Sequence, residues 1–172
     1  MTKQPVAERL LARLITVLSQ EMRMYNELLL VLRKKQSSII EGQLEDLREA
    51  MSQEQTLLQQ SEEVAKTRAS SLKAVGEALG SEDEIQSVSQ LIAVVESTYS
   101  ERLSDIHRSL QQILKEVMLT NEENSYLLDY SIKFVRDAAR ELIKSSERFP
   151  VYSAEGKDDQ GTQGSSLIEG RI

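Results

Sequence analysis

The sequence predicts an all-α protein: an antiparallel bundle of three long, coiled-coil-like helices and one short helix, followed by a disordered C-terminal tail. Residues 6–149 contain no proline, although about seven would be usual in a stretch of that length. Only Gly42, Gly76 and Gly80 lie within it. Proline and glycine both interrupt helices. The apolar residues recur at steps of three and four, whereas a strand requires a period of two.

Three apolar stripes mark the long helices, which we expect over residues 6–40, 43–79 and 99–147. The first stripe runs through Leu11, Ile15, Leu18, Met22, Tyr25, Leu29 and Leu32. The second runs through Leu44, Leu47, Met51, Leu58, Ala65, Leu72, Val75 and Leu79, with Glu54, Ser61 and Arg68 diluting its other position. The third runs through Leu103, Ile106, Leu110, Ile113, Val117, Asn121, Asn124, Leu128, Ser131, Val135, Ala138 and Leu142. Such sustained spacing is typical of helices that wind around one another.

Turn and cap residues predict where these helices end. Gly42 suits a left-handed turn between the first two helices, and Gly76 and Gly80 close the second. Residues 81–84 (Ser-Glu-Asp-Glu) read as a capping box that opens the short helix. A second box, Thr98 with Glu101, is a place where the last long helix starts or kinks.

The lengths of the three long helices are unequal. At 1.5 Å per residue they measure about 52, 55 and 73 Å. If they share a common lower end, the last helix overhangs the other two by a few turns. We therefore expect much of residues 135–147, including Val135, Ala138 and Leu142, to remain uncovered by the first two helices.

Length and composition narrow the class of protein. The 172 residues allow one helical domain, residues 1–148, with a flexible tail over 149–172. A net charge of −7 argues against binding nucleic acid, and zero cysteines exclude disulfides and thiolate chemistry. No apolar window is long enough for membrane insertion, and the N-terminus lacks the apolar core of a signal peptide. We expect a cytoplasmic location.

Catalytic motifs are missing from the sequence, so we expect a protein that is not an enzyme and uses no cofactor or metal. His107 is the single histidine, at the edge of a helix seam, and helical di-metal sites need Glu-x-x-His pairs from two helices. Gly-rich phosphate loops and nucleophile elbows are also absent from the sequence.

The end of the last long helix has an unusually broad apolar face, about 180° wide at 100° per residue. It holds Leu127, Ile132, Phe134, Val135, Ala138, Ala139, Leu142 and Ile143. Either neighbouring helices cover this face or part of it receives a partner helix; the expected overhang favours the partner. Asn121 and Asn124 occupy seam positions, where they either fix the register or bind an incoming chain. Tyr126 and Tyr130 are either ordinary surface tyrosines or contact anchors.

Three segments resemble the FlgN family of flagellar export chaperones. Residues Leu119–Leu128 (LTNEENSYLL), with Ser131 and Phe134–Val135, are similar to its Asn-x-x-Asn-x-x-Leu-Leu segment. Residues Lys34–Gly42 (KKQSSIIEG) are similar to the junction between its first two helices, and Pro150–Gly156 (PVYSAEG) resembles its Tyr-x-Ala-x-Gly element. Each segment is short, but the three occur in the family's order and spacing, and the resemblance covers the whole chain.

The resemblance implies a cytoplasmic chaperone of the flagellar type III export system. Its partners would be hook-associated junction proteins of the FlgK and FlgL type, bound through their C-terminal helices and kept from polymerising, and an export-gate protein of the FlhA type. The cargo-binding residues that it implies are Asn124, Leu127, Leu128, Ser131, Phe134, Val135, Ala138 and Leu142. Tyr152 would dock on the export gate. The rival hypothesis is a structural coiled-coil scaffold, or another soluble coiled-coil component of the export apparatus.

Overall fold

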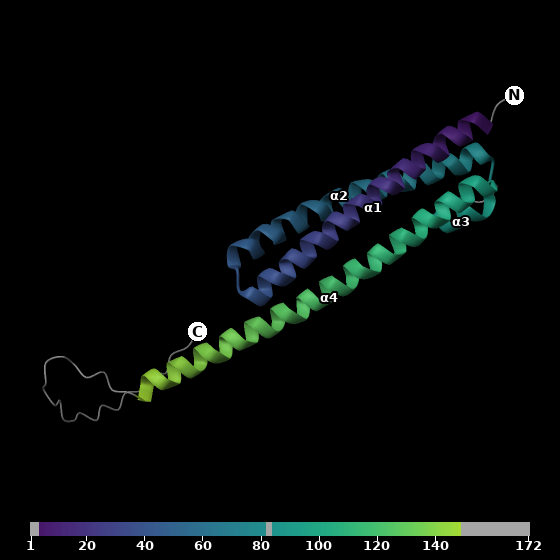
Figure 1. Cartoon of the computed structure of the whole chain (residues 1–172). Coiled ribbons are helices and arrows are strands. Elements are labelled where there is room, and N and C mark those ends of the chain that lie inside the picture. The colour runs from purple at the N-terminus through teal and green to yellow at the C-terminus, as the bar shows by residue number, and fades with distance from the viewer. Residues whose placement is uncertain (1–3, 82–83, 149–172) are drawn as a thin grey trace, which may run out of the picture. The chain divides into compact units, whose positions relative to one another are not determined.

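The computed structural model describes residues 4–81 and 84–148, and this part of the chain folds into four helices (Figure 1). They are α1 (Gln4–Glu41), α2 (Leu44–Leu79), α3 (Val88–Val94) and α4 (Ser97–Arg148). The predicted all-α fold, with three long helices and one short one, is confirmed. The predicted tail, residues 149–172, lies outside the described residues. The chain divides into two units, Met1–Ile132 and Lys133–Ile172, which we describe separately.

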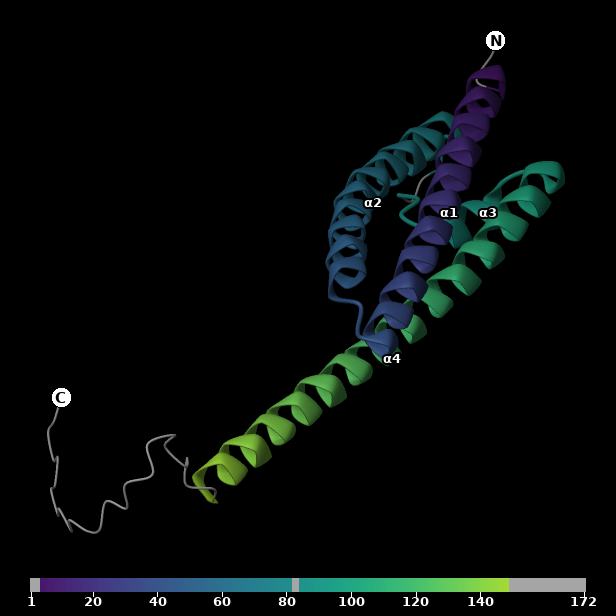
Figure 2. The ribbon, with the colours of Figure 1, turned by 60° about the vertical axis from the view of Figure 1, so that its left-hand side comes forward.

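In the first unit, α1 and α2 form an antiparallel pair joined by a tight turn (Figures 1 and 2). Gly42 has a φ of 70°, the left-handed conformation predicted for it. The amide of Gln43 donates to the carbonyl of Ser38 over 2.9 Å, which satisfies one carbonyl at the end of α1. Close to the turn, Lys34 Nζ lies 2.8 Å from Glu49 Oε2. This hydrogen bond raises the pKa of Lys34 and lowers that of Glu49.

The short helix α3 has a capping box, but not the predicted one. Ser87 is the N-cap: its hydroxyl accepts from the amide of Gln90, and the Gln90 side chain accepts from the amide of Ser87 over 3.1 Å. The prediction of a box at residues 81–84 was wrong about the start of α3, because α3 begins later, at Val88. Ile85 instead packs against Gly76, where an added Cβ would stand 3.4 Å from the Ile85 side chain. Gly76 lies inside α2, and only Gly80 caps it.

The core of the first unit has two clusters along the helices. The larger one gathers residues of all four helices together with Ile85, which precedes α3: Leu11, Leu14, Ile15, Leu18, Leu72, Val75, Ile85, Val88, Leu91, Leu103 and Leu110. The second, nearer the α1–α2 turn, contains Met24, Leu28, Leu32 and Leu57, with Val117 of α4 packed against it. Every residue of the predicted α1 stripe is buried or half-buried.

The predicted seam of α2 is wrong over its first half. Leu44, Met51 and Leu58 are exposed, whereas Ala50 and Leu57 are buried. The helix is therefore rotated, so that the polar positions thought to dilute the seam face α1.

Two ion pairs join α1 to α2 at these polar positions. Lys35 Nζ lies 2.7 Å from Glu54 Oε2, and both side chains are largely buried. Glu21, which is fully buried, pairs with Arg68. Because Lys35, Glu54 and Glu21 have little access to water, removing the partner of any of them leaves a poorly solvated charge unpaired, which is costly. The pairs therefore favour the register that brings them together.

Candidate protein-binding surface

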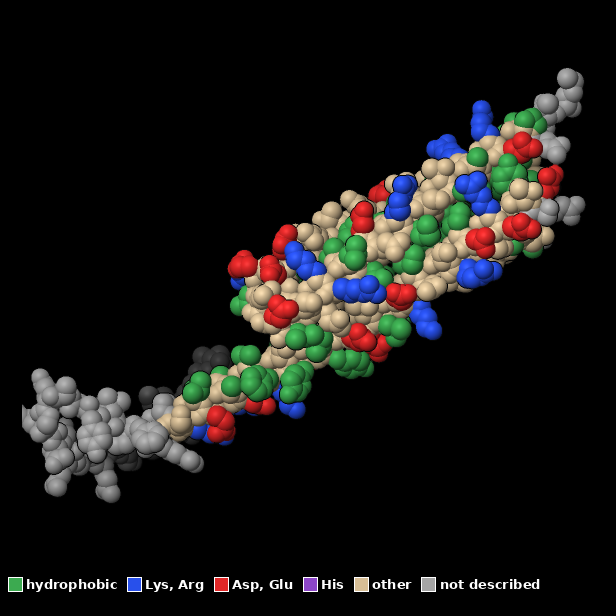
Figure 3. Space-filling view, viewed as in Figure 1, with side chains coloured by type: hydrophobic (Ala, Val, Ile, Leu, Met, Phe, Trp, Pro, Cys, Tyr) green, Lys and Arg blue, Asp and Glu red, His purple; other side chains and the backbone are tan. Residues whose placement is uncertain are grey.

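The second unit contains the end of α4, whose described part is residues 133–148. Its apolar side chains lie on one side of the helix, since Phe134, Val135, Ala138 and Leu142 follow steps of one, three and four. All four are exposed, with 66% of Val135 and 71% of Leu142 accessible to solvent. Figure 3 shows hydrophobic side chains along this stretch. Val135, Ala138 and Leu142, which were predicted to remain uncovered, are exposed side chains of this unit.

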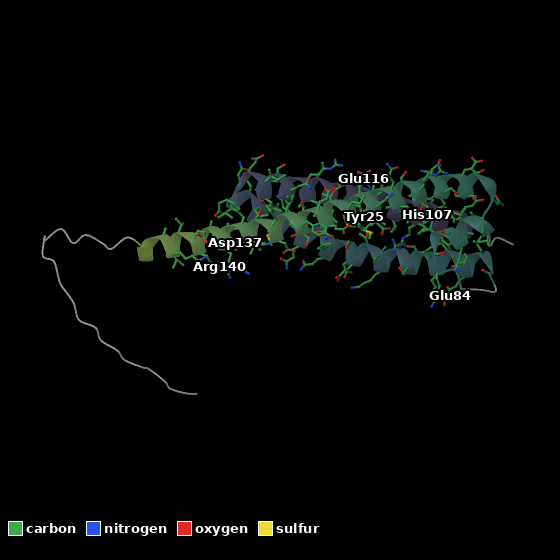
Figure 4. The ribbon with its side chains drawn as sticks, turned by 90° about the horizontal axis from the view of Figure 1, so that it is seen from below. Tyr25, Glu84, His107, Glu116, Asp137 and Arg140 are labelled. Atoms are coloured by element: carbon green, nitrogen blue, oxygen red, sulfur yellow. The ribbon has the colours of Figure 1, made fainter. Side chains whose placement is uncertain are left out.

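The opposite side of this stretch is charged. Arg140 Nη1 lies 3.5 Å from Asp137 Oδ1, and Lys144 Nζ lies 3.0 Å from Glu141 Oε1, so both pairs join residues three apart on α4. Asp137 and Arg140 are labelled in Figure 4. Exposed pairs at this spacing contribute only a few tenths of a kcal/mol. With charges on one side and exposed apolar side chains on the other, this stretch of the helix is amphipathic. We call Phe134, Val135, Ala138 and Leu142 the C-terminal face.

The other residues implied to bind cargo lie in the first unit. Leu127, Leu128 and Ser131 are half-buried. Asn124 is 0% exposed, and its Nδ2 donates to the backbone carbonyl of Leu32 over 2.8 Å. Asn124 therefore joins α4 to α1, which fits the hypothesis that it fixes the register. The structure thus brings four of the eight residues together on an exposed face and places Asn124 in the bundle.

Asn121 differs from Asn124, because its side chain is exposed rather than in the seam. Tyr126 and Tyr130 are also exposed. Tyr152, the residue implied to dock on the export gate, lies outside the described residues.

His107 lies at the edge of the bundle, as predicted. It is half-buried, and its Nε2 lies 3.1 Å from the Ser89 hydroxyl of α3 (Figure 4). A cavity of about 240 Å³ is lined by Leu18, Glu21, Arg68, Leu72, Gln86, Ser87, Val88, His107, Leu110, Gln111 and Leu114. Nearby, burial raises the pKa of Tyr25, the Glu21 carboxylate raises it further, and Arg68 opposes the rise.

Sequence reasoning missed the two ion pairs and the exposed apolar side chains of α2. The sequence did contain a signal for the pairs. Glu54 and Arg68 lie seven residues before and after Ser61, so both charges fall on the face of α2 that includes Leu57. Charges at seam spacing can be matched to opposite charges on the partner helix, here Lys35 and Glu21.

In the part of the chain that the structure describes, no helix is both long enough and apolar enough to cross a membrane. Among the same residues, no group of three or more His, Asp or Glu side chains is placed to hold a metal ion.

The helical fold and the exposed C-terminal face define a helical-bundle protein with a surface suited to binding another protein. Comparison with protein families matches residues 1–160 to the FlgN protein family. The chain belongs to this family, which supports a role as a flagellar export chaperone. No match is found among curated proteins or among solved structures.

Proposed function

We propose that this chain is a cytoplasmic chaperone of the flagellar type III export system, without catalytic activity. It binds the C-terminal helices of hook-associated proteins of the FlgK and FlgL type, prevents their premature polymerisation and delivers them to an export-gate protein of the FlhA type. Family membership supports the general role. The cargo-binding step rests on the exposure of Phe134, Val135, Ala138 and Leu142 on one side of an amphipathic helix.

A contiguous apolar face on a helix fits an amphipathic partner helix. The C-terminal segments of junction subunits would polymerise through such helices, so covering them keeps the subunits apart. A typical specific interface buries about 1,600 Å² in total. The C-terminal face would supply only part of that area.

The first experiment is calorimetric titration of the full chain with the isolated C-terminal segment of a cognate FlgK-type or FlgL-type protein. We expect saturable binding, lost when the apolar helix face of the segment is replaced by polar residues. No binding by a folded chain, together with a stable oligomer, would instead support the coiled-coil scaffold.

Variants then locate the binding surface. Val135→Asp and Leu142→Asp should each weaken binding by about tenfold, because a charge would have to be desolvated in the interface. Both side chains are exposed, so the circular dichroism spectrum should not change. The matched control is Tyr130→Asp, which puts the same charge at an exposed aromatic position outside the C-terminal face. Equal weakening by the control would show that charge alone causes the loss.

The export-gate step has its own test. Tyr152→Ala should leave folding and cargo binding unchanged but reduce delivery of cargo to the gate, measured as secreted FlgK-type protein in cells. Unchanged secretion would contradict the role given to Tyr152.

A further inference from the structure

The short helix α3 fills only one end of the groove between α2 and α4. Ile85, just before α3, packs on Gly76 of α2, and Ser89 of α3 lies 3.1 Å from His107 of α4. Figure 2 shows α3 in this position between the two longer helices. At this level the bundle has four helices. Further along, where α3 is absent, α2 and α4 continue with α1 as a bundle of three.

On α2, the face that α3 and its preceding residues cover continues beyond them. Leu72 is buried in the four-helix level, and Ala65, Leu58 and Met51 follow it at intervals of seven residues, so they lie on the same side of α2. Burial is lost along this row: Ala65 is half-buried, and Leu58 is 49% exposed. The apolar row on α2 therefore extends beyond α3, the helix that covers its first part.

On α4, too, apolar side chains become exposed beyond the part that α3 covers. Gln111 and Leu114 line both the cavity beside the start of α3 and an adjoining groove of about 760 Å³. The groove is further lined by Lys115, Met118, Leu119, Asn121, Glu122 and Ser125. Met118 is 71% exposed. On α1, Leu32 contacts Asn124 of α4 and Lys35 contacts Glu54 of α2, so the row from Leu114 to Ser125 lies at the level of the uncovered row of α2. We call the two rows together the α2–α4 groove.

We propose that the α2–α4 groove binds a helix of the cargo's C-terminal segment, which completes the four-helix bundle below α3. This inference rests on the proposed function, because it assigns the chaperone's cargo a second contact besides the C-terminal face. The continuity of the groove with the α3 interface determines the kind of occupant. Because the groove continues the surface that α3 covers, we expect its occupant to be a helix that lies, like α3, between α2 and α4.

The dimensions and chemistry of the groove define this helix further. From Leu114 to Ser125, or from Met51 to Ala65, the groove accommodates about 11 to 14 residues, or three to four turns. In α3 the packed side chains are Val88, Leu91 and Ile92, at the spacing i, i+3, i+4, and α3 contains no charged residue. The groove wall on α4 has one charge of each sign, Lys115 and Glu122. We therefore expect an amphipathic helix with apolar residues at i, i+3, i+4 and i+7 and mostly uncharged neighbours.

The absence of cysteine from the sequence allows a direct test in the full chain. Three single-cysteine variants at exposed positions report on different surfaces: Met118→Cys on the groove, Leu142→Cys on the C-terminal face, and Leu30→Cys on a separate surface between α1 and α2. Each is labelled with a maleimide dye, with and without a saturating amount of the FlgK-type C-terminal segment. A helix in the groove should slow labelling at position 118 by about tenfold or more while position 30 reacts as before.

The outcomes distinguish a failure of the groove proposal from a failure of the proposed function. Protection at 142 but not at 118 overturns the groove and keeps cargo binding. Protection at neither position, with no binding detected by calorimetry, overturns both. Protection at 118 that rises with chaperone concentration before any segment is added assigns the groove to a second copy. Protection at 118 that is independent of concentration and of the segment assigns it to this chain's own residues 149–172. Both of these results contradict the proposal.

Affinity gives a second readout. Met118→Asp and Leu58→Asp should each weaken binding of the segment by about tenfold, because each places an unpaired charge under the docked helix. Leu30→Asp is the matched control, since Leu30 is 64% exposed and lies outside the groove. If all three variants bind the segment with the same affinity as the unmodified chain, the proposal that the groove binds cargo is overturned.

Discussion

Two stretches of α4 carry the same kind of apolar pattern in different surroundings. From Leu103 to Asn124 the pattern meets α1, α2 and α3, and both of these end residues are fully buried. From Lys133 to Arg148 the pattern continues, yet every described side chain is exposed. The comparison shows that periodicity predicts which side of a helix is apolar but not what covers that side.

The two stretches therefore contribute differently to folding. Burial of the first stretch removes apolar surface from water, which stabilises the bundle by about 25 cal/mol per Å². The second stretch contributes little to the free energy of folding, because its apolar side chains remain in water. A protein that keeps such a face gains no folding free energy from it until a partner covers it.

The largest expected effect tests this contrast with one substitution made in each stretch. Leu103→Ala should lower the free energy of unfolding by about 3 to 4 kcal/mol, because it opens a cavity in the main core cluster. Leu142→Ala should change it by less than about 0.5 kcal/mol. Urea denaturation followed by circular dichroism measures both. A large loss for Leu142→Ala would show that the C-terminal face is buried in the folded protein.

A smaller loss is expected at the ion pair beside the core. Arg68→Leu leaves the Glu21 carboxylate buried without a cation and should lower the free energy of unfolding by about 2 to 3 kcal/mol. The double variant Glu21→Leu with Arg68→Leu should recover much of this loss, because no buried charge remains. A double variant less stable than Arg68→Leu would show that the unpaired Glu21 carboxylate is not the cause of the loss.

The sequence predicted the helices closely because their boundaries depend on local chemistry. Gly42 and Gly80 both adopt the left-handed conformation that glycine permits, and α1, α2 and α4 begin and end within two residues of the predicted positions. The rotation of α2 was not predictable from apolar residues alone. It depends on the pairing of Glu54 and Arg68 with α1, which is a tertiary contact.

The candidate site could be predicted only in part, for the same reason. The exposure of Phe134, Val135, Ala138 and Leu142 was expected from the apolar spacing and the length of the last helix, both of which can be read from the sequence. The burial of Asn124 and the exposure of Asn121 depend on how α4 is rotated against α1, which the heptad pattern left open. The α2–α4 groove was not predicted, because it exists only where the short α3 ends.

The two asparagines provide the next comparison. Asn124→Ala should lower the free energy of unfolding by about 1 to 2 kcal/mol, because it removes a buried hydrogen bond to Leu32 and leaves a small cavity. The Asn124 Oδ1 atom has no hydrogen-bond partner among the described residues, so part of the loss is offset. Asn121→Ala, at an exposed position, should change stability by less than about 0.5 kcal/mol. Equal effects would contradict the rotation of α4 seen here.

The smallest expected effect is the contribution of Tyr25 to the pH dependence of the free energy of unfolding. Burial and the Glu21 carboxylate hold the pKa of Tyr25 above its ordinary value of 10.0 in the folded protein. The unfolded chain therefore releases this proton at lower pH than the folded chain. The stability that Tyr25 contributes is fully present below about pH 10 and is lost as the pH rises through the folded pKa. Stability should thus fall more steeply in alkali for the unmodified chain than for Tyr25→Phe.

Comparing these two proteins cancels the titration of groups that they share. The free energy of unfolding is measured in urea at about pH 8 and again about one pH unit above the ordinary tyrosine value. The excess loss in the unmodified chain is the contribution of Tyr25. The absorbance change at 295 nm that disappears with Tyr25→Phe should be centred above pH 10. If it is centred lower, Arg68 outweighs burial and Glu21 at this phenol, and the two curves should then converge or cross.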